Sequence, residues 1–289
     1  MSVTEPFGFF ASGIAAGIKS SGKPDLALVV NKGPKFSAAG VFTSNRIKAA
    51  PVLWSEQVLN TGKLKAVILN SGGANACTGP DGFADTHRTA EYVAGKLEID
   101  PLEVAVCSTG LIGIRLPMEK LLNGVDIAVN DMNSHGGNAA ATAIMTTDSV
   151  AKTAVVKSGD WTVGGMAKGA GMLAPGLATM LVVITTDADV DSDVLSRALS
   201  HSVRYSFDRI DSDGCMSTND SVIVLANGAS GISPDEEEFT VALTEVCANL
   251  ARQLIGDAEG ASKDIRIDVV NALTESDALD VARSVARSN

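Results

Sequence analysis

Thr179, at the start of an apolar run, is the residue best suited to nucleophilic chemistry in residues 164–181 (GGMAKGAGMLAPGLATML). If the chain is cleaved after Ala178, Thr179 becomes N-terminal. Its α-amine then has an ordinary pKa near neutrality and can take the proton from its own hydroxyl. Lys168 could set the electrostatics of such a site or hold a substrate carboxylate. The alternative is an ordinary strand threonine and a surface lysine, because threonine is common in strands.

The same stretch formally matches the dinucleotide fingerprint GxGxxA at residues 169–174, with Asp187 and Asp189 downstream. Pro175 and Gly176 fall where the phosphate-binding helix should be, and no clear strand is predicted before Lys168. A P-loop is excluded because the sequence has no GK[ST]. We therefore expect a loop that carries Lys168 and leads to Thr179.

Two further segments follow apolar runs and are rich in small residues. In residues 107–113 (CSTGLIG), the Thr109 hydroxyl and the Gly110 N–H could converge as an oxyanion hole, with donors preset where negative charge develops. In residues 70–79 (NSGGANACTG), the glycines permit positive φ and expose backbone N–H groups. The alternative for both segments is a plain turn after a strand.

Two polar segments complete the set of candidates. Thr146, in residues 145–148 (MTTD), could bind polar groups of a substrate, and Lys152 follows closely. Residues 206–220 (SFDRIDSDGCMSTND) resemble a calcium loop, but Cys215 takes its fifth position and Val222 the twelfth, which requires a bidentate Glu. Hydrogen-bonded turns near the active site are the better interpretation, and no metal site is predicted.

The four cysteines form no CxxC pair, so the sequence predicts neither a zinc site nor a disulfide framework. Buried free thiols are expected at Cys77, Cys107, Cys215 and Cys247. The net charge of −11, without a Lys/Arg-rich run, argues against nucleic-acid binding. No signal peptide is visible, and the longest apolar run, near residues 180–184, is too short to cross a membrane, so a cytoplasmic location is expected.

The elements that must position these residues are visible as apolar patterns. Hydrophobic residues make up 45% and aromatic residues 4% of the chain, which favours tight aliphatic packing of helices on sheets in an α/β or α+β fold. No domain boundary is apparent. Buried strands are predicted at residues 25–30, 66–69, 104–107, 181–185 and 221–225, and helices at residues 85–97, 191–203, 239–255 and 276–286.

Taken together and in this order, six segments resemble the ornithine acetyltransferase family, also called glutamate N-acetyltransferase. They are NSGGANACTG, CSTGLIG, MTTD, KGAGMLAPGLATML, FDRIDSDGCMSTND and DAEGASK, the last at residues 257–263. The resemblance runs from about residue 8 to residue 289. It implies a layered αββα sandwich of the self-processing, N-terminal-nucleophile kind.

The resemblance also implies specific roles. Self-cleavage between Ala178 and Thr179 would give an α chain of residues 1–178 and a β chain of residues 179–289, both parts of one intertwined fold. Thr179 would take the acetyl group from N-acetylornithine and pass it to glutamate, in arginine biosynthesis, with ping-pong kinetics. Thr109 and Gly110 match the oxyanion positions, and the substrate-contacting positions are matched by Thr146, Lys168, Thr179 and Glu259. The Glu259 carboxylate suits the ammonium group of ornithine.

No metal or cofactor is implied, although some members of the family accept acetyl-CoA as donor. The expected partners are the small-molecule substrates and the α and β chains, which would pair and assemble further. Family members continue for roughly a hundred residues beyond this point, the length of a small domain. Two alternatives remain open: a related threonine-nucleophile amidase or aminopeptidase, and an inactive shortened fragment.

Overall fold

The computed structural model describes residues 2–173 and 180–288, and among these residues the strands form two sheets. The first sheet has four strands in the order β1-β2-β4-β5, and the second has five in the order β3-β9-β8-β7-β6. The strands of the first sheet are β1 (Phe9–Ile14), β2 (Leu26–Asn31), β4 (Ala66–Gly73) and β5 (Val104–Leu111). Those of the second are β3 (Ser37–Phe42), β6 (Lys152–Ser158), β7 (Trp161–Lys168), β8 (Leu181–Thr186) and β9 (Ser221–Ala226).

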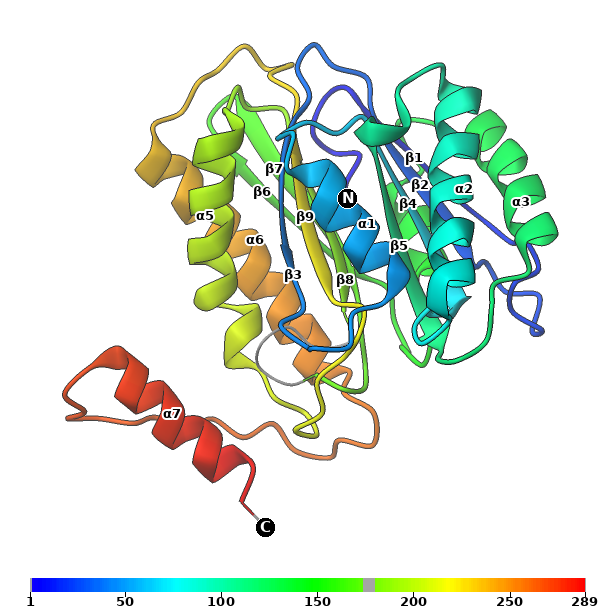
Figure 1. Cartoon of the computed structure of the whole chain (residues 1–289). Helices are drawn as coiled ribbons and strands as arrows, with labels where there is room; N and C mark the ends of the chain where they lie inside the picture. Colours follow the sequence, from blue (N-terminus) through cyan, green and yellow to red (C-terminus); the bar gives the residue numbers. More distant parts are fainter. Residues whose placement is uncertain (1, 174–179, 289) are drawn as a thin grey trace.

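The two sheets pack face to face, and helices cover their outer faces (Figure 1). Successive side chains of a strand point to opposite faces, and β8 shows what this achieves. Leu181 and Val183 join the core shared with the first sheet, whereas Val182 and Ile184 join the core beneath α5 and α6. The covering helices are α2 (Gly79–Leu97) and α3 (Met118–Asp131) on the first sheet, and α5 (Ser192–Arg204) and α6 (Glu236–Gly256) on the second. The predicted αββα sandwich is therefore confirmed.

In the part of the chain that the structure describes, the other three helices are α1 (Ala50–Leu59), α4 (Gly137–Ala143) and α7 (Glu275–Ala286). Two side chains fasten α1 to β5: Trp54 Nε1 donates to the carbonyl of Val104 at 2.9 Å, and Ser55 Oγ donates to that of Val106 at 2.7 Å. Helix α4 packs against β1 and β2. Helix α7 lies apart from the sandwich and has no buried residue (Figure 1). None of the helices in the described ranges is long and apolar enough to cross a membrane.

All five predicted strands are present as β2, β4, β5, β8 and β9, and the four predicted helices as α2, α5, α6 and α7. The remaining elements were not predicted; α4 is short and rich in Ala and Gly, whereas α3 has 14 residues with an apolar face and was simply missed. One explicit expectation is wrong: β7 directly precedes Gly169 and ends at Lys168. The dinucleotide fold is excluded all the same, because β7 and β8 are antiparallel and the fingerprint needs a parallel βαβ unit.

The cysteine prediction is half right. All four thiols are free, and Cys107 and Cys247 are buried as expected, but Cys77 and Cys215 are exposed. Cys77 lies in the loop before α2 with a positive φ of 57°, and Cys215 lies in the polar loop before β9. Local loop geometry, rather than the general tendency of cysteine to be buried, decides these two positions.

Candidate active site

A cavity of about 660 Å³ opens where β4, β5 and β7 end. It is lined by every candidate catalytic or substrate-binding residue within the described ranges: Thr109, Gly110, Thr146, Lys168 and Glu259. Ala178 and Thr179, the predicted cleavage position and nucleophile, lie outside the described residues. The fold thus gathers residues that are far apart in the sequence around one space.

A glycine follows Thr109 because the end of β5 lies very close to the backbone of β4. Strands β4 and β5 are parallel here, with Ser71 opposite Thr109 and Gly72 opposite Gly110. Gly110 has a φ of +129°, and a Cβ at this position would lie 2.5 Å from the carbonyl carbon of Gly72. No other residue fits such a conformation and such a close approach. The glycine allows the backbone after Thr109 to turn against β4 at the edge of the cavity.

Lys168 is the last residue of β7, and only 1% of it is exposed. The predicted loop at this position is therefore wrong. Its Nζ donates a hydrogen bond to Oγ1 of Thr109 at 3.2 Å. Burial lowers the pKa of Lys168 to about 8, while Asp148 opposes that shift. Since the Thr109 oxygen accepts from Lys168, its own proton is free to point toward a substrate oxygen.

Asp148 organises the backbone on the other side of Lys168. Its carboxylate accepts hydrogen bonds from the backbone N–H of Thr146 at 2.9 Å and of Gly169 at 2.6 Å, and from Lys152 Nζ at 2.7 Å. Burial would raise the pKa of Asp148, but the charge of Lys168 and these hydrogen bonds bring it below its ordinary value. The carboxylate therefore remains ionised inside the protein and holds Thr146 in place.

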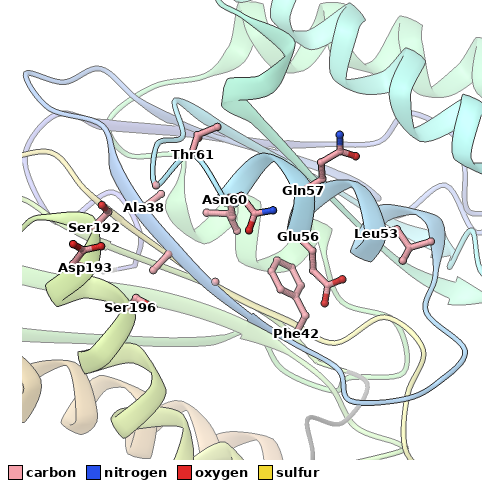
Figure 2. A pocket seen from close by; sticks show the side chains of 14 residues that line it. Ala38, Phe42, Leu53, Glu56, Gln57, Asn60, Thr61, Ser192, Asp193 and Ser196 are labelled. Carbon is pink, nitrogen blue, oxygen red and sulfur yellow. The ribbon is translucent and has the colours of Figure 1, made fainter.

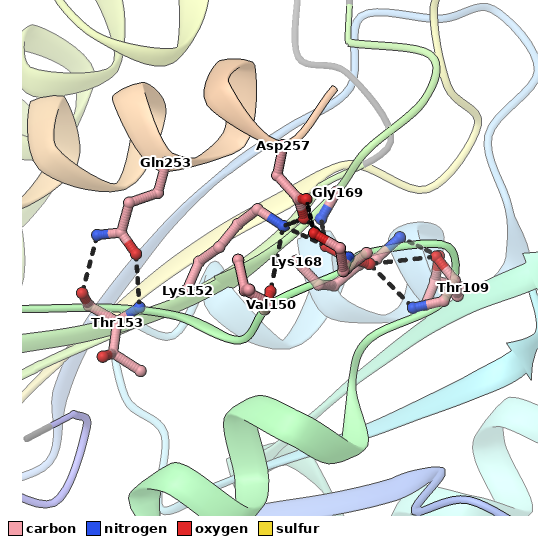
Figure 3. A network of polar contacts seen from close by, with 11 residues as sticks. Thr109, Val150, Lys152, Thr153, Lys168, Gly169, Gln253 and Asp257 are labelled. Atoms are coloured by element: carbon pink, nitrogen blue, oxygen red, sulfur yellow. Dashed lines mark hydrogen bonds and ion pairs between the residues drawn. The ribbon is translucent and has the colours of Figure 1, made fainter. Parts of the chain in front are cut away.

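Lys152 pairs with Asp148 and also reaches Asp257, directly after α6, as Figure 3 shows for Lys152 and Asp257. The Lys152 side chain is fully buried, and its Nζ also lies 2.6 Å from Oδ2 of Asp257. Beyond Asp257, the backbone N–H of Glu259 donates to the carbonyl of Ala170 at 2.6 Å. A Cβ on Gly171 would lie 2.9 Å from Oε2 of Glu259, so the glycine leaves room for this carboxylate beside the cavity.

The start of β8 lies beside Lys168. In the antiparallel register Lys168 pairs with Leu181, the second residue after Thr179. The backbone N–H of Met180 donates to Oδ1 of Asp220 at 3.0 Å. Burial raises the pKa of Asp220 well above its ordinary value, and its Oδ2 has no hydrogen-bond partner within the described part of the chain. A buried acidic group thus fixes the backbone next to the predicted nucleophile.

The Asp- and Ser-rich segment before β9 supports the loop that follows Lys168. The backbone N–H of Met172 donates to Asp213 Oδ2 at 2.6 Å, and that of Leu173 donates to Ser212 Oγ at 3.0 Å. Hydrogen-bonded turns near the site, as predicted, account for this segment. Within residues 2–173 and 180–288, no group of three or more His, Cys, Asp or Glu side chains could hold a metal ion.

A larger cavity, of about 810 Å³, lies between α1, β3 and α5 (Figure 2). Among the described residues that line it, Glu56 and Asp193 are charged, and none is a predicted site residue. It has no lysine or arginine to hold a substrate carboxylate and no close hydroxyl–lysine pair. The smaller cavity is therefore the better candidate for the active site, despite its size.

Residues 10–289 match a family model described as ArgJ family. The chain belongs to the ArgJ family. The arginine biosynthesis bifunctional protein ArgJ of Streptomyces avermitilis is 68% identical over 289 residues, which are 100% of this chain and 76% of that protein. The predicted family membership is thus confirmed, and the chain spans about three quarters of this ArgJ relative.

Solved structures agree with the assignment to the ArgJ family. The ornithine acetyltransferase of Mycobacterium tuberculosis, solved in complex with ornithine, is 66% identical, with a TM-score of 0.60 over 61% of this chain and 96% of that chain. The L-aminopeptidase D-Ala-esterase/amidase of Ochrobactrum anthropi, described as a variant of the Ntn hydrolase fold, is 13% identical. Its TM-score is 0.55 over 90% of this chain and 88% of that chain, and it shows the shared fold alone.

Sequence reasoning gave no role to Asp148 and Asp257, and it missed two further charged residues of this ArgJ-family site, Lys19 and Asp220. Lys19 lines the cavity from the loop between β1 and β2. Asp220 is completely buried at the start of β9. An acidic residue directly before an apolar strand was a visible signal for Asp220, whereas nothing in the residues around Lys19 indicates a site.

Proposed function

We propose that this chain transfers the acetyl group of N-acetylornithine to glutamate through an acetyl ester on Thr179. The observation that carries the proposal is the convergence of Thr109, Gly110, Lys168 and Glu259 on one cavity in a member of the ArgJ family. The hydrogen-bonded start of β8 supports it, because Met180 directly follows the nucleophile in the chain. The mechanism uses no cofactor, and acetyl-CoA is a second donor to be assayed.

In the first half of the reaction, the Thr179 hydroxyl oxygen attacks the acetyl carbonyl carbon of N-acetylornithine. The α-amine of Thr179 takes the hydroxyl proton and passes it to the ornithine nitrogen as the carbon–nitrogen bond breaks. The negative charge on the carbonyl oxygen is stabilised by the Thr109 hydroxyl and the Gly110 N–H. Lys168 strengthens the Thr109 donor through their hydrogen bond.

In the second half, the α-amine of glutamate attacks the ester carbonyl and the Thr179 oxygen leaves. The proton lost by the glutamate nitrogen returns to the threonine oxygen through the α-amine. Both substrates use the same oxyanion donors, since each half-reaction passes through a tetrahedral intermediate on the same carbon. Thr146 contacts the bound substrate, and Glu259 pairs with the ammonium group of ornithine.

The nucleophile becomes available when the bond between Ala178 and Thr179 is cleaved by the threonine itself. One finding on a relative supports this step. The match to the chain in the M. tuberculosis crystal includes 96% of that chain but only 61% of the present chain. The crystallised chain is therefore the shorter of the two. The match to the full-length M. tuberculosis ArgJ protein includes 99% of the present chain but only 73% of that protein. The full-length protein is therefore longer than the present chain. Cleavage of the M. tuberculosis protein into two chains would explain why the crystallised chain is shorter than the full-length protein.

The proposal includes the association of the two cleavage products. Strands β7 and β8 lie on opposite sides of the cleavage position and are hydrogen-bonded neighbours in one sheet, so residues 1–178 and 179–289 would stay together as a heterodimer. Assembly of heterodimers into a larger oligomer, and a cytoplasmic site of action, belong to the same proposal.

Intact mass and N-terminal sequencing of the purified protein test the cleavage, and acetyl transfer to glutamate tests the reaction. The wild-type protein should give two masses and an N-terminus at Thr179. Thr179→Ala should abolish cleavage and transfer, whereas Thr179→Ser should keep part of both because the hydroxyl remains.

Three results would contradict the proposal. Transfer by Thr179→Ala would show that another group is the nucleophile. Release of acetate without transfer would favour an amidase of the same fold. Cooperative unfolding without either activity would identify a folded but inactive fragment.

A further inference from the structure

The loop between β1 and β2 forms one wall of the active-site cavity, with lining residues Ile18, Lys19, Ser20 and Ser21. A buried carboxylate gives this loop its shape. Asp25 is completely buried and accepts hydrogen bonds from the backbone N–H of Ala16 at 2.7 Å and of Lys19 at 2.8 Å. The backbone of Lys19 is therefore held at the cavity wall, unlike that of a lysine in an unconstrained loop.

The Lys19 side chain is held as well. Its stem crosses Gly72, where a Cβ would lie 3.1 Å from Cγ of Lys19. Its Nζ donates to the carbonyl of Pro24 at 2.8 Å and to that of Met145 at 2.7 Å. Among the described residues these two carbonyls are its only hydrogen-bond partners. An ammonium group has three N–H donors, so one remains for a ligand in the cavity that Lys19 lines.

No carboxylate within the described ranges neutralises Lys19 directly. The ion pairs among these residues do not include it, although burial lowers the pKa of Lys19 and the charges of Asp25 and Asp148 oppose that shift. The Lys19 side chain is partly buried, and a charge at the edge of the protein attracts an anion more strongly than one in open water. The second lysine of the cavity, Lys168, already donates to the Thr109 hydroxyl.

The two substrates of the proposed reaction make opposite demands on this cavity. Both present an α-nitrogen to the acetyl group, so their side chains must extend into the same region. The ornithine side chain ends in an ammonium group, which suits Glu259, whereas the glutamate side chain ends in a carboxylate, which Glu259 repels. A cavity that accepts both needs a cation within reach of the side chain as well as the anion.

We propose that Lys19 is the specificity-determining residue that binds the side-chain carboxylate of the glutamate acceptor. This inference rests on the proposed function, because it assumes that glutamate enters the cavity in the second half-reaction. Lys19 supplies one charge-assisted hydrogen bond in that half-reaction and has no corresponding partner on the ornithine side chain.

The test separates the two half-reactions in wild-type protein, Lys19→Met and Lys23→Met. Lys23 is an exposed lysine of the same loop and serves as the matched control. Release of ornithine from N-acetylornithine in a single turnover reports the first half-reaction, and steady-state transfer reports the second. Lys19→Met should raise the KM for glutamate by about tenfold or more, the effect of losing a charged hydrogen bond, and should leave ornithine release within about twofold.

Glutamine, which lacks the side-chain charge, gives an independent readout as acceptor. Wild-type protein and Lys23→Met should prefer glutamate to glutamine, and Lys19→Met should lose that preference. An equal loss in both half-reactions would overturn the inference, because it would mean that Lys19 only supports Met145 and its neighbours.

The wild-type measurement stands even if Lys19→Met does not fold. Equal use of glutamine and glutamate by the wild-type protein would overturn the role of Lys19 while leaving the transferase intact. Absence of ornithine release from the wild-type protein would instead overturn the proposed function, and the inference with it.

Discussion

Burial brings the pKa of Lys168 to about 8, so its ammonium group loses its proton just above neutral pH. The proposed mechanism needs this charge, because the ammonium group polarises the Thr109 hydroxyl. The α-amine of Thr179 has the opposite requirement, since it acts as a base only when neutral. Activity should therefore rise with pH as the amine loses its proton and fall as Lys168 loses its own.

The alkaline limb can be assigned by substitution. In a profile of kcat/KM against pH, which reports the free enzyme, the wild-type protein should lose activity near pH 8. Lys168→Arg should keep some activity and lose that alkaline limb, because a guanidinium group stays charged. Lys168→Met should be nearly inactive across the whole range. An unchanged limb in Lys168→Arg would assign it to another group.

A second prediction for a single residue concerns the substitution of Gly110. Alanine there meets the Gly72 backbone at 2.5 Å and must keep a φ of +129°. Gly110→Ala should lower the free energy of unfolding by about 1–3 kcal/mol from overpacking, in addition to strain, and abolish transfer.

Gly113→Ala is the matched control, because Gly113 also has a positive φ of 84° but a Cβ there meets nothing within 4 Å. Gly113→Ala should lower the free energy of unfolding by only about 1–2 kcal/mol, which is the cost of the left-handed conformation for alanine. Chemical denaturation and transfer assays of both variants would check the difference. Equal losses would mean that the close approach of Gly110 to β4 is unimportant.

At the scale of elements, Lys152 joins the start of β6 to the end of α6. Its buried ammonium lies 2.7 Å from Asp148 and 2.6 Å from Asp257. Lys152→Met should lower the free energy of unfolding by about 3–5 kcal/mol, because it leaves buried carboxylate charge unpaired. It should also raise the KM for N-acetylornithine, since Glu259 follows the end of α6 that Lys152 holds.

Lys157→Met is the matched control on the same strand. Lys157 forms an ion pair with Glu5, and its side chain is 67% exposed. Lys157→Met should therefore lower the free energy of unfolding by no more than about 1 kcal/mol. The Lys152 effect should also depend on pH. The pKa of Asp148 is depressed in the folded state, so its contribution is present above the unfolded pKa and is lost as the pH falls through the folded value. Urea unfolding at neutral and acidic pH would give the free energy of unfolding of both variants. If both variants lost the same free energy at neutral pH, the proposed role of Lys152 in joining β6 to the end of α6 would be contradicted.

At the scale of the whole molecule, stability is unevenly distributed. The cores lie between the two sheets and beneath α5 and α6, while α7 buries no residue. Its polar links to the sandwich include ion pairs from Arg204 and Arg209 to Glu275, a hydrogen bond from the Tyr205 hydroxyl to Glu275, and one from Arg283 to the carbonyl of Asp208. Large apolar side chains around it, such as Leu273 at 95%, are exposed.

Amide hydrogen exchange should reveal this uneven stability. Backbone amides of α7 should exchange orders of magnitude faster than those of β8 and β9, because exposed segments open locally whereas core strands exchange only on global unfolding. Mass spectrometry of peptic fragments would measure the difference. Protection of α7 equal to that of β8 would show contacts that its exposure does not indicate.

The sequence by itself determined the strongly apolar strands and their order. The first half of β4 and most of β8 and β9 are aliphatic, and such runs must be buried in any fold the chain adopts. It also indicated Thr109 and Gly110, a hydroxyl and a glycine directly after an apolar run, and it indicated Lys168 as a lysine on the way to Thr179, although it predicted a loop and not a strand end at that position. The motif order was sufficient to identify the family.

Only the tertiary structure decided which residues meet. Lys168 becomes buried against Thr109, and Lys152 joins Asp148 to Asp257, because strands and helices far apart in the chain end at the same place. The weak strands β1, β3, β6 and β7 form because their neighbours provide hydrogen bonds and an apolar face, which their own residues do not indicate. Lys19 lines the cavity for the same reason, since proximity across a fold leaves no periodic pattern in the residues around it.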